Sequence, residues 1–420
     1  MPERAWLLVL LALAGCSAAV EDGSTSGNPL LVHDTRSPQV LNPQGVFIPD
    51  PAPQAERELL PELEFRELSA GLPPSGTWSG RPLLCDFNGD GRADLIASNC
   101  EEQGYRAWQA PGPTETLWQP RNEGLTPGLG CSACCAIDFD RDGRVDLALS
   151  SFASGVRVFL NDGRMNWREA SGLAGTPPVG DLAKGDRELV GVGYPRGGLL
   201  VLLGDGRGAL AEEEFGRRLA LVDLDLDGRD DIVVATGTRV RVFLTVPGSP
   251  PRWREQSAGL PAPARPDSLR GLCVGRFRSG ARPQIAVCSQ PDPALPESER
   301  DSIGVFAWDE ARGAWEHVDA GLPRGECYAD LAAADFDGDG KLDLALLSLE
   351  HGAAIYLGDG QGGFRAKGRL AGAHGRGRLA VGDIDGDGRP DLVLAVPAAQ
   401  DGPEGGGVRA FLNQPAIWAR

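Results

Sequence analysis

Short apolar runs and acidic, glycine-rich loops alternate along most of this chain. A run of small residues such as LAAAD (331–335) leads into a loop, and an apolar run such as LALLS (344–348) follows it. Next come a segment such as AAIYLGDG (353–360) and an aromatic one such as AWEHVDAGL (314–322). Short runs of this kind between Gly, Pro and Asp turns are typical of β-strands. The pattern therefore predicts four short strands per repeat.

Five intact acidic loops set the spacing of the repeats. Each has Asp or Asn at its first, third, fifth and ninth positions and Gly at the sixth, and the loops begin at Asp86, Asp138, Asp223, Asp335 and Asp383. Degenerate copies beginning at Asp181 and Arg276 fill the two large gaps, so that the starts follow at intervals of roughly 40 to 60 residues. This period suits one four-stranded blade. We expect an all-β, seven-bladed β-propeller over residues 62–420.

The two ends of the repeat region are expected to pair. After the seventh loop only two more strands fit before the chain ends, so the last blade lacks a fourth strand. Residues 64–73 (EFRELSAGLP) have the pattern of a fourth strand and precede the first loop. We expect this N-terminal strand to pair with 408–414 (VRAFLNQ) and to close the ring, which leaves no long open edge.

The loops have the composition of calcium sites. Calcium binds about six to eight oxygens, which the four Asp or Asn side chains and the carbonyl of the seventh residue would supply, while Gly at the sixth position allows a positive φ. The predicted ligands for up to five Ca²⁺ are Asp86, Asn88, Asp90, Arg92, Asp94; Asp138, Asp140, Asp142, Arg144, Asp146; Asp223, Asp225, Asp227, Arg229, Asp231; Asp335, Asp337, Asp339, Lys341, Asp343; and Asp383, Asp385, Asp387, Arg389, Asp391. The alternative is a set of acidic turns that need no ion.

The N-terminal segment is typical of a lipoprotein signal. Arg4 precedes an apolar run at 6–14 that is too short to span a membrane, and small residues then lead to Cys16. We expect a signal peptide at 1–15 and lipidation of Cys16, with an ordinary cleavage site as the alternative. Ser17 favours sorting to the outer membrane, facing either the periplasm or the cell surface. Residues 16–61, rich in Ser, Pro, Gly and Gln, are expected to form a flexible tether.

Eight cysteines remain beside Cys16, an even number that suits an oxidising compartment. Cys273 and Cys288 flank the degenerate loop at 276 and are the best candidates for a disulfide. Cys85 and Cys100 flank the first loop less symmetrically. The remaining cysteines, Cys131, Cys134, Cys135 and Cys327, could form either further disulfides or a thiolate metal site.

The loops and the strands that follow them resemble the FG-GAP/VCBS repeats of integrin-α-type β-propellers. The resemblance rests on the D-x-D-x-D-G-x-x-D loops and on strands such as VRVFLNDG (156–163), and it covers residues 62–420. It implies a seven-bladed propeller with calcium in the hairpin between the first two strands of a blade. It also implies binding or adhesion rather than catalysis. Loss of ligands at 181 and 276, and Asn88 in the first loop, depart from the family pattern.

Composition narrows the function further. The formal charge of −18 argues against nucleic acid as a partner, and the four His form no HExxH or evident triad order. We expect a monomeric module that binds a protein or glycan, with insertions at 101–130 and 289–313 as recognition candidates. One alternative is a calcium-dependent polysaccharide lyase or hydrolase, which would need convergent groups such as Arg276, Arg278, His317 or Tyr328. Another is a structural subunit of an outer-membrane complex.

Overall fold

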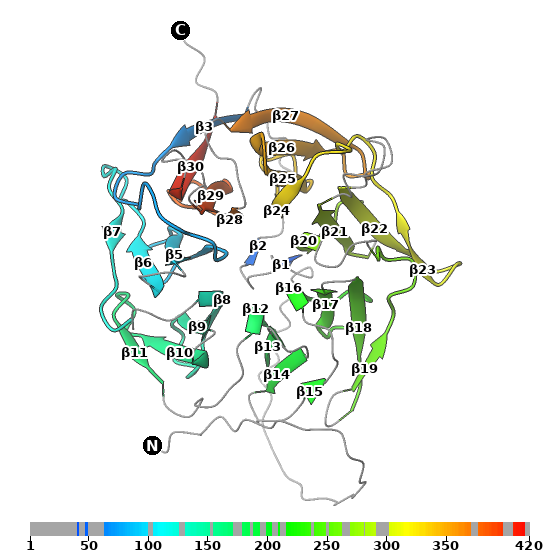
Figure 1. Ribbon diagram of the computed structural model, residues 1–420, viewed down its shortest axis with the longest axis horizontal. Coiled ribbons are helices and arrows are strands. Elements are labelled where there is room, and N and C mark those ends of the chain that lie inside the picture. The colour runs from blue at the N-terminus through cyan, green and yellow to red at the C-terminus, as the bar shows by residue number, and fades with distance from the viewer. Residues whose placement is uncertain are drawn as a thin grey trace, which may run out of the picture.

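A computed structural model shows a ring of antiparallel β-sheets arranged as a propeller (Figure 1). The structure describes residues 40–41, 47–48, 63–99, 104–125, 131–151, 154–170, 179–184, 188–193, 199–203, 209–210, 216–236, 239–248, 252–262, 269–280, 282–290, 302–370, 377–397 and 406–415. The first strand of each sheet lies toward the centre of the ring and the last lies at its rim. The prediction of an all-β propeller is confirmed.

The described strands pair into seven four-stranded sheets. Six of these sheets use four consecutive strands: β4 (Leu83–Cys85), β5 (Asp94–Asn99), β6 (Gly104–Gln109) and β7 (Gln119–Pro120); β8 (Cys131–Ile137), β9 (Asp146–Ser151), β10 (Gly155–Asn161) and β11 (Trp167–Glu169); β12 (Val179–Lys184), β13 (Glu188–Gly193), β14 (Leu199–Leu203) and β15 (Ala209–Leu210); β16 (Gly216–Val222), β17 (Asp231–Thr236), β18 (Val240–Val246) and β19 (Arg252–Glu255); β20 (Leu269–Gly275), β21 (Gln284–Ser289), β22 (Ile303–Asp309) and β23 (Ala314–His317); and β24 (Tyr328–Ala334), β25 (Asp343–Ser348), β26 (Gly352–Gly358) and β27 (Phe364–Leu370).

The seventh sheet joins the two ends of the repeat region. It contains β28 (Arg378–Gly382), β29 (Asp391–Val396), β30 (Gly407–Pro415) and, as its outer strand, β3 (Leu63–Glu67). β3 runs antiparallel to β30, with Glu64 opposite Gln414 and Glu67 opposite Phe411. Beyond β3, the amide of Leu68 donates to the carbonyl of Ala410 (2.8 Å). The first residues of the segment at 64–73 therefore pair with the strand that its pattern indicated, and β3 itself ends at Glu67.

The apolar core is divided among the interfaces between sheets. Seven clusters of buried side chains each bridge two consecutive sheets, and one of them joins the β28–β30 sheet to the β4–β7 sheet. Five second strands, β5, β9, β17, β25 and β29, are buried along their whole length, because both of their faces contact a neighbouring sheet. The continuous apolar run LALLS is explained by this two-sided burial.

Aromatic residues fasten consecutive sheets together at the rim. The amide of Trp315 in β23 donates to the carbonyl of Ala258, in the turn after β19, and its indole Nε1 donates to the carbonyl of Gln256 (2.8 Å each). The same backbone contact joins Trp118 to Ala70, Trp167 to Glu123 and Phe364 to Ala320. The turns after these outer strands, A-G-L at three of them and E-G-L at 123–125, are thus docking sites for the next sheet.

A small two-stranded sheet lies within the range predicted to be a tether. β1 (Val40–Leu41) and β2 (Phe47–Ile48) pair antiparallel, and β1 lies beside β16 and β20 inside the ring (Figure 1). Part of this range is therefore paired in a β-sheet, whereas a flexible tether was expected for all of it. The predicted signal peptide, Cys16 and most of the tether lie outside the described residues. No helix among the described residues is both long and apolar enough to cross a bilayer.

Strands occupy part of each of the two insertions predicted for recognition. β6 and β7 occupy 104–109 and 119–120, and β22 occupies 303–309, so these segments complete their sheets. The prediction treated them as loops because the acidic loops alone set the register. Residues 101–103, 126–130 and 291–301 lie outside the described residues.

Candidate metal centres in the hairpin loops

The five intact acidic loops connect the first strand of a sheet to its second, as the sequence indicated. In the loop between β24 and β25, the first residue, Asp335, accepts hydrogen bonds from the amides of Asp339 (3.0 Å) and Gly340 (2.8 Å). The carboxylates of Asp86, Asp138, Asp223 and Asp383 accept the equivalent pair of amide bonds in their own loops. The first position therefore folds the loop around its own carboxylate.

The ninth residue connects the loop to two strands. Asp343 is fully buried, and its carboxylate accepts hydrogen bonds from the amides of Phe336 in the loop and Gly358 in β26 (2.8 Å each). Its counterparts Asp94, Asp146, Asp231 and Asp391 are also fully buried and bound in the same way. One carboxylate thus holds the loop, the second strand and the third strand together.

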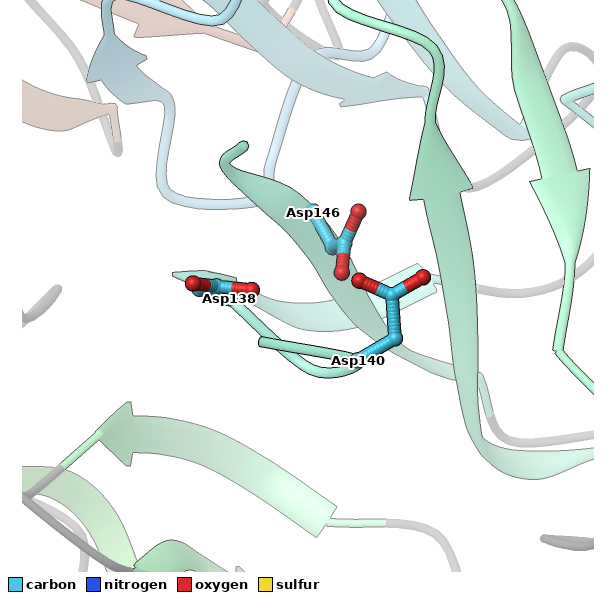
Figure 2. A group of neighbouring side chains, drawn as sticks. All are labelled: Asp138, Asp140 and Asp146. Atoms are coloured by element: carbon cyan, nitrogen blue, oxygen red, sulfur yellow. The ribbon is translucent and has the colours of Figure 1, made fainter. Parts of the chain in front are cut away.

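Carboxylate oxygens converge inside these loops. In three loops the first, third and ninth residues each place a ligand atom within 4.8 Å of the others: Asp138, Asp140 and Asp146; Asp223, Asp225 and Asp231; and Asp383, Asp385 and Asp391. In the β24–β25 loop the converging residues are Asp335, Asp337 and Asp339. Figure 2 shows Asp140 and Asp146 with their carboxylates close together and Asp138 on the facing part of the loop. In the first loop, Asn88 occupies the third position, and its side-chain oxygen accepts a hydrogen bond from the amide of Asp90 (2.9 Å).

The buried charge of the ninth residue is poorly compensated by the protein alone. Burial raises the pKa of Asp343 and Asp391 to about 8, although backbone amides oppose the shift and nearby carboxylates add to it. The same cause raises the pKa of Asp94 and Asp231 to about 7 and that of Asp146 to about 6. A cation in the loop would offset the cost of this desolvation and of the repulsion between carboxylates.

The fifth and seventh residues form an ion pair at the surface of each loop. Lys341 Nζ lies 2.7 Å from Asp339 Oδ2, and Arg92 pairs with Asp90 at 2.5 Å. The corresponding pairs are Arg144 with Asp142, Arg229 with Asp227, and Arg389 with Asp387. The seventh residue was predicted only as a carbonyl ligand, so its side-chain role was missed.

Backbone conformation agrees with the glycine prediction and adds to it. The sixth-position glycine has a positive φ, 82° at Gly340. The fourth position is also left-handed, even where it is Arg141 (60°) or Leu226 (63°). The sequence could have indicated this second bend, because Gly occupies the fourth position in the other three intact loops.

The prediction of a degenerate loop beginning at Asp181 is wrong. Asp181 lies within β12, opposite Val192, and follows a bulge after Val179. Asp330 follows the same kind of bulge in β24, five residues before its loop begins. The DLAKGDRE segment looked like a short loop because it has acidic residues around a glycine, but its first acid, Asp181, belongs to the inner strand.

The copy at 276 forms a hairpin without acidic ligands. Phe277 is buried at the second position, and Gln284 at the ninth accepts the amide of Arg278 (2.8 Å) through its side chain. A neutral amide therefore takes part of the role of the buried aspartate. Arg276 and Arg278 stand at the positions of the first two acids, so this loop cannot assemble the carboxylate cluster.

The cysteine predictions are not supported. Cys273 and Cys288 are free thiols, and the register places Cys273 opposite Ala286 and Cys288 opposite Gly271. Cys134 and Cys135 lie in different clusters on the two faces of β8. Cys327 belongs to a different sheet, and among the described residues no group of potential ligands contains a cysteine. Cys100 and the side chain of Cys131 lie outside the described part.

The residues considered for catalysis do not converge. Arg276 and Arg278 lie at the loop end of their sheet, whereas Tyr328 is buried at the opposite end of an inner strand. His317, in outer strand β23, contacts the carboxylate of Asp319 through Nε2 and stacks on Phe306. These side chains occupy separate parts of the fold.

Comparison with known proteins identifies the repeats. Residues 86–149 and 305–394, which contain four of the five intact loops, match the FG-GAP-like repeat family. The matched segments are FG-GAP-like repeats, and they lie within a β-propeller. A search of curated proteins found no match to this propeller.

Solved structures share the fold of this propeller at low sequence identity. The BP39L lectin from Burkholderia pseudomallei has 14% identity and a TM-score of 0.56, covering 81% of this chain and 99% of the lectin. BBS1N, solved in complex with ARL6DN, has 13% identity and a TM-score of 0.53, covering 86% of this chain and 98% of BBS1N. At these identities the likeness concerns the fold alone.

Proposed function

We propose that this protein is a calcium-stabilised, seven-bladed propeller that is anchored in the bacterial outer membrane and binds a protein or glycan. The observation that carries the calcium assignment is the fully buried ninth-position aspartate, which recurs in all five intact loops. The donor set consists of oxygens, as a hard divalent cation prefers. Convergence of carboxylates within 4.8 Å in four loops supports the same conclusion.

The residues of each loop would share the work of holding the ion. The first, third and ninth side chains supply charge, and amide hydrogen bonds hold the carboxylates of Asp335 and Asp343 in place before an ion arrives. A bound Ca²⁺ supplies the positive charge that the buried carboxylates lack. Because the ninth residue also contacts the second and third strands, metal binding stabilises the sheet as well as the loop.

Such loops leave the ligand-binding role to other surfaces. FG-GAP propellers are typically binding modules, and the residues considered for catalysis lie apart in this fold. One protein of the same fold is a lectin, so glycans are the first ligand class to test. Lipidation at Cys16 would attach the propeller to the membrane through the segment before β3.

Three measurements test the proposal. Equilibrium dialysis against calcium, followed by elemental analysis, should find up to five ions per chain, and none bound would refute the metal assignment. A glycan array probed with calcium-loaded protein, alongside affinity capture from intact cells, should then give a ligand that competes in solution. Failure of both binding screens would remove the support for a recognition module.

A further inference from the structure

The intact acidic loops are not evenly distributed around the ring. Four of them belong to the consecutive sheets that start with β24, β28, β4 and β8 (Figure 1), and these loops begin at 335, 383, 86 and 138. The fifth begins at 223, between the β12 sheet and the β20 sheet. Only three residues separate β12 from β13, and the hairpin after β20 has no acidic ligands. The chain therefore has one row of four neighbouring loops and one isolated loop.

A buried asparagine joins the loops at 86 and 138. Asn161, at the end of β10, donates through Nδ2 to the carbonyl of Phe87 in the neighbouring loop (2.6 Å) and to that of Val145 in its own loop (2.9 Å). Its backbone amide donates to Asp146, the ninth residue of its own loop (2.8 Å). The amide of Phe87 donates to Asp94, the ninth residue of the other loop (3.1 Å). One line of hydrogen bonds therefore connects the two ninth-position carboxylates.

Asn413 in β30 makes the same connection between the loops at 335 and 383. Its Nδ2 donates to the carbonyl of Phe336, and its backbone amide donates to Asp391 (2.7 Å each). The amide of Phe336 donates in turn to Asp343 (2.8 Å). Both connecting asparagines are buried. Their hydrogen bonds are therefore shielded from water and stronger than the same bonds at the surface.

The loops at 383 and 86 are joined through the backbone. The amide of Ala93, next to the ninth residue of its loop, donates to the carbonyl of Asp383, the first residue of the other loop (2.7 Å). The two loops also lie against each other, because a β-carbon added to Gly386 would lie 3.3 Å from the carbonyl oxygen of Gly91. Direct contacts therefore run without a break along the row of four loops.

The isolated loop is held differently at the same place. Thr245 stands where the asparagine stands in β10, since its amide donates to the ninth residue, Asp231 (2.8 Å). Its hydroxyl donates to the carbonyl of Asp230 within its own loop (2.6 Å). A threonine side chain has a single hydrogen to donate, whereas the amide group of Asn161 has two. Thr245 can therefore hold its own loop but has no donor left for a second one.

We propose that calcium binds with positive cooperativity along the row of four loops, whereas the loop at 223 binds its ion independently. Asn161 and Asn413 are positioning residues for this coupling. The coupling rests on the calcium assignment proposed above, and it adds an order among the sites that the assignment alone does not contain.

The hydrogen bonds supply the physical reason. When the loop at 86 is fixed by its ion, the carbonyl of Phe87 is fixed with it. That carbonyl holds the side chain of Asn161, whose backbone amide positions Asp146. The loop at 138 then loses less conformational entropy when it binds its own ion, so its calcium affinity is higher. Linkage makes the effect reciprocal between the two loops.

Hydrogen exchange at a series of buffered free-calcium concentrations tests the coupling, because each loop of the full chain gives its own peptides. Asp140→Asn weakens the loop at 138. It should raise the calcium midpoint for protection of the loop at 86 by about fivefold or more and leave the loop at 223 unchanged. Asp225→Asn makes the same change at the third position of the isolated loop and is the matched control. It should raise the midpoint of its own loop only.

Asn161→Thr tests the route of the coupling. The variant places in β10 the residue type that β18 carries as Thr245, so it should keep the bond to its own loop and lose the bond to Phe87. The shift that Asp140→Asn causes in the loop at 86 should then disappear. An asparagine with a purely structural role would lower stability and leave that shift in place, and this result would overturn the role of Asn161. Comparing two shifts removes the stability loss common to both.

The remaining outcomes separate the coupling from the calcium assignment. Calcium-independent protection in every loop would overturn both. Calcium-dependent protection in the five loops, with an unmoved midpoint at 86 in Asp140→Asn, would overturn the cooperativity alone. A common shift of all loops, including the one at 223, would indicate global unfolding and would also overturn it. If Asn161→Thr does not fold, the comparison of Asp140→Asn with Asp225→Asn still decides whether neighbouring loops are coupled.

Discussion

A β-carbon placed on Gly259 would lie 2.1 Å from the carbonyl oxygen of Trp315. Gly259 belongs to the A-G-L turn after β19, has a φ of 88°, and lies where β23 of the next sheet docks. Gly71, Gly124 and Gly321 have the same conformation and the same close approach to Trp118, Trp167 and Phe364. Glycine is required there both for its backbone conformation and for the contact between sheets.

Gly259→Ala should therefore be far more destabilising than an ordinary glycine replacement. A left-handed conformation costs an L-residue about 1 to 2 kcal/mol, and the clash with Trp315 adds an overpacking cost of roughly 1 to 3 kcal/mol. Urea unfolding of calcium-loaded protein would measure the loss in free energy.

Gly313→Ala is the matched control for this substitution. Gly313 lies in the turn before Trp315 and has a φ of 62°, and a β-carbon added to it would have no other atom within 4 Å. Its replacement should cost only the conformational part, about 1 to 2 kcal/mol. Equal losses in the two variants would mean that the contact with Trp315 contributes nothing.

The sequence predicts the propeller well because each repeat is marked by residues that lie close together in the chain. Asp at fixed positions, Gly at the sixth and apolar runs on either side are all consequences of one hairpin. The contact between Gly259 and Trp315 could not be predicted in this way. The A-G-L turn is visible as a repeat, but the residue that docks on Gly259 lies 56 positions further along the chain. Only the ring geometry brings the two together.

The error at Asp181 has the same origin. Local spacing could not distinguish a ligand from an inner-strand residue, because both are aspartates close to a glycine. The distinction appears when Asp181 is compared with Asp330, which follows the same bulge and, like it, accepts an amide hydrogen bond from the next sheet. The sequence shows the charge of Asp181 and Asp330, but only the folded ring shows that both lie on inner strands beside the next sheet.

Asp343→Asn should remove one calcium ion and lower stability. The substitution removes the charge of a buried carboxylate and places an amide where two backbone N–H groups need acceptors. One site saturated at a hundredfold excess over its Kd contributes about 2.7 kcal/mol. Elemental analysis and thermal unfolding, each with and without EDTA, would measure both effects.

The comparison with and without EDTA separates metal binding from packing. The difference between Asp343→Asn and the unaltered protein should shrink in EDTA, where neither holds the ion. Glu350→Gln, at a side chain that is 75% exposed and outside the loops, should change neither calcium content nor melting. An unchanged calcium content in Asp343→Asn would refute the assignment of this residue as a ligand.

Cys273 and Cys288 should behave as buried thiols. Both are fully inside the sheet, and burial raises their pKa, so the reactive thiolate is scarce. Iodoacetamide should leave them unmodified in the native protein and alkylate both after unfolding without a reductant. Peptide mass spectrometry would detect this, whereas modification only after reduction would demonstrate a disulfide.

Removing β3 should damage the whole propeller, because β3 covers the edge of β30. Phe65 in β3 packs edge-on against Phe336 at a centroid distance of 6.2 Å, which links this strand to the β24–β27 sheet as well. A chain beginning at residue 68 would leave the backbone groups of β30 unpaired and expose apolar surface on both sheets. We expect a lower unfolding midpoint, loss of cooperativity and aggregation, measured by thermal denaturation and light scattering.

A chain beginning at residue 62 is the matched control, because it keeps β3 and should unfold in one transition. If the two chains melt alike, β3 does not close the ring in solution.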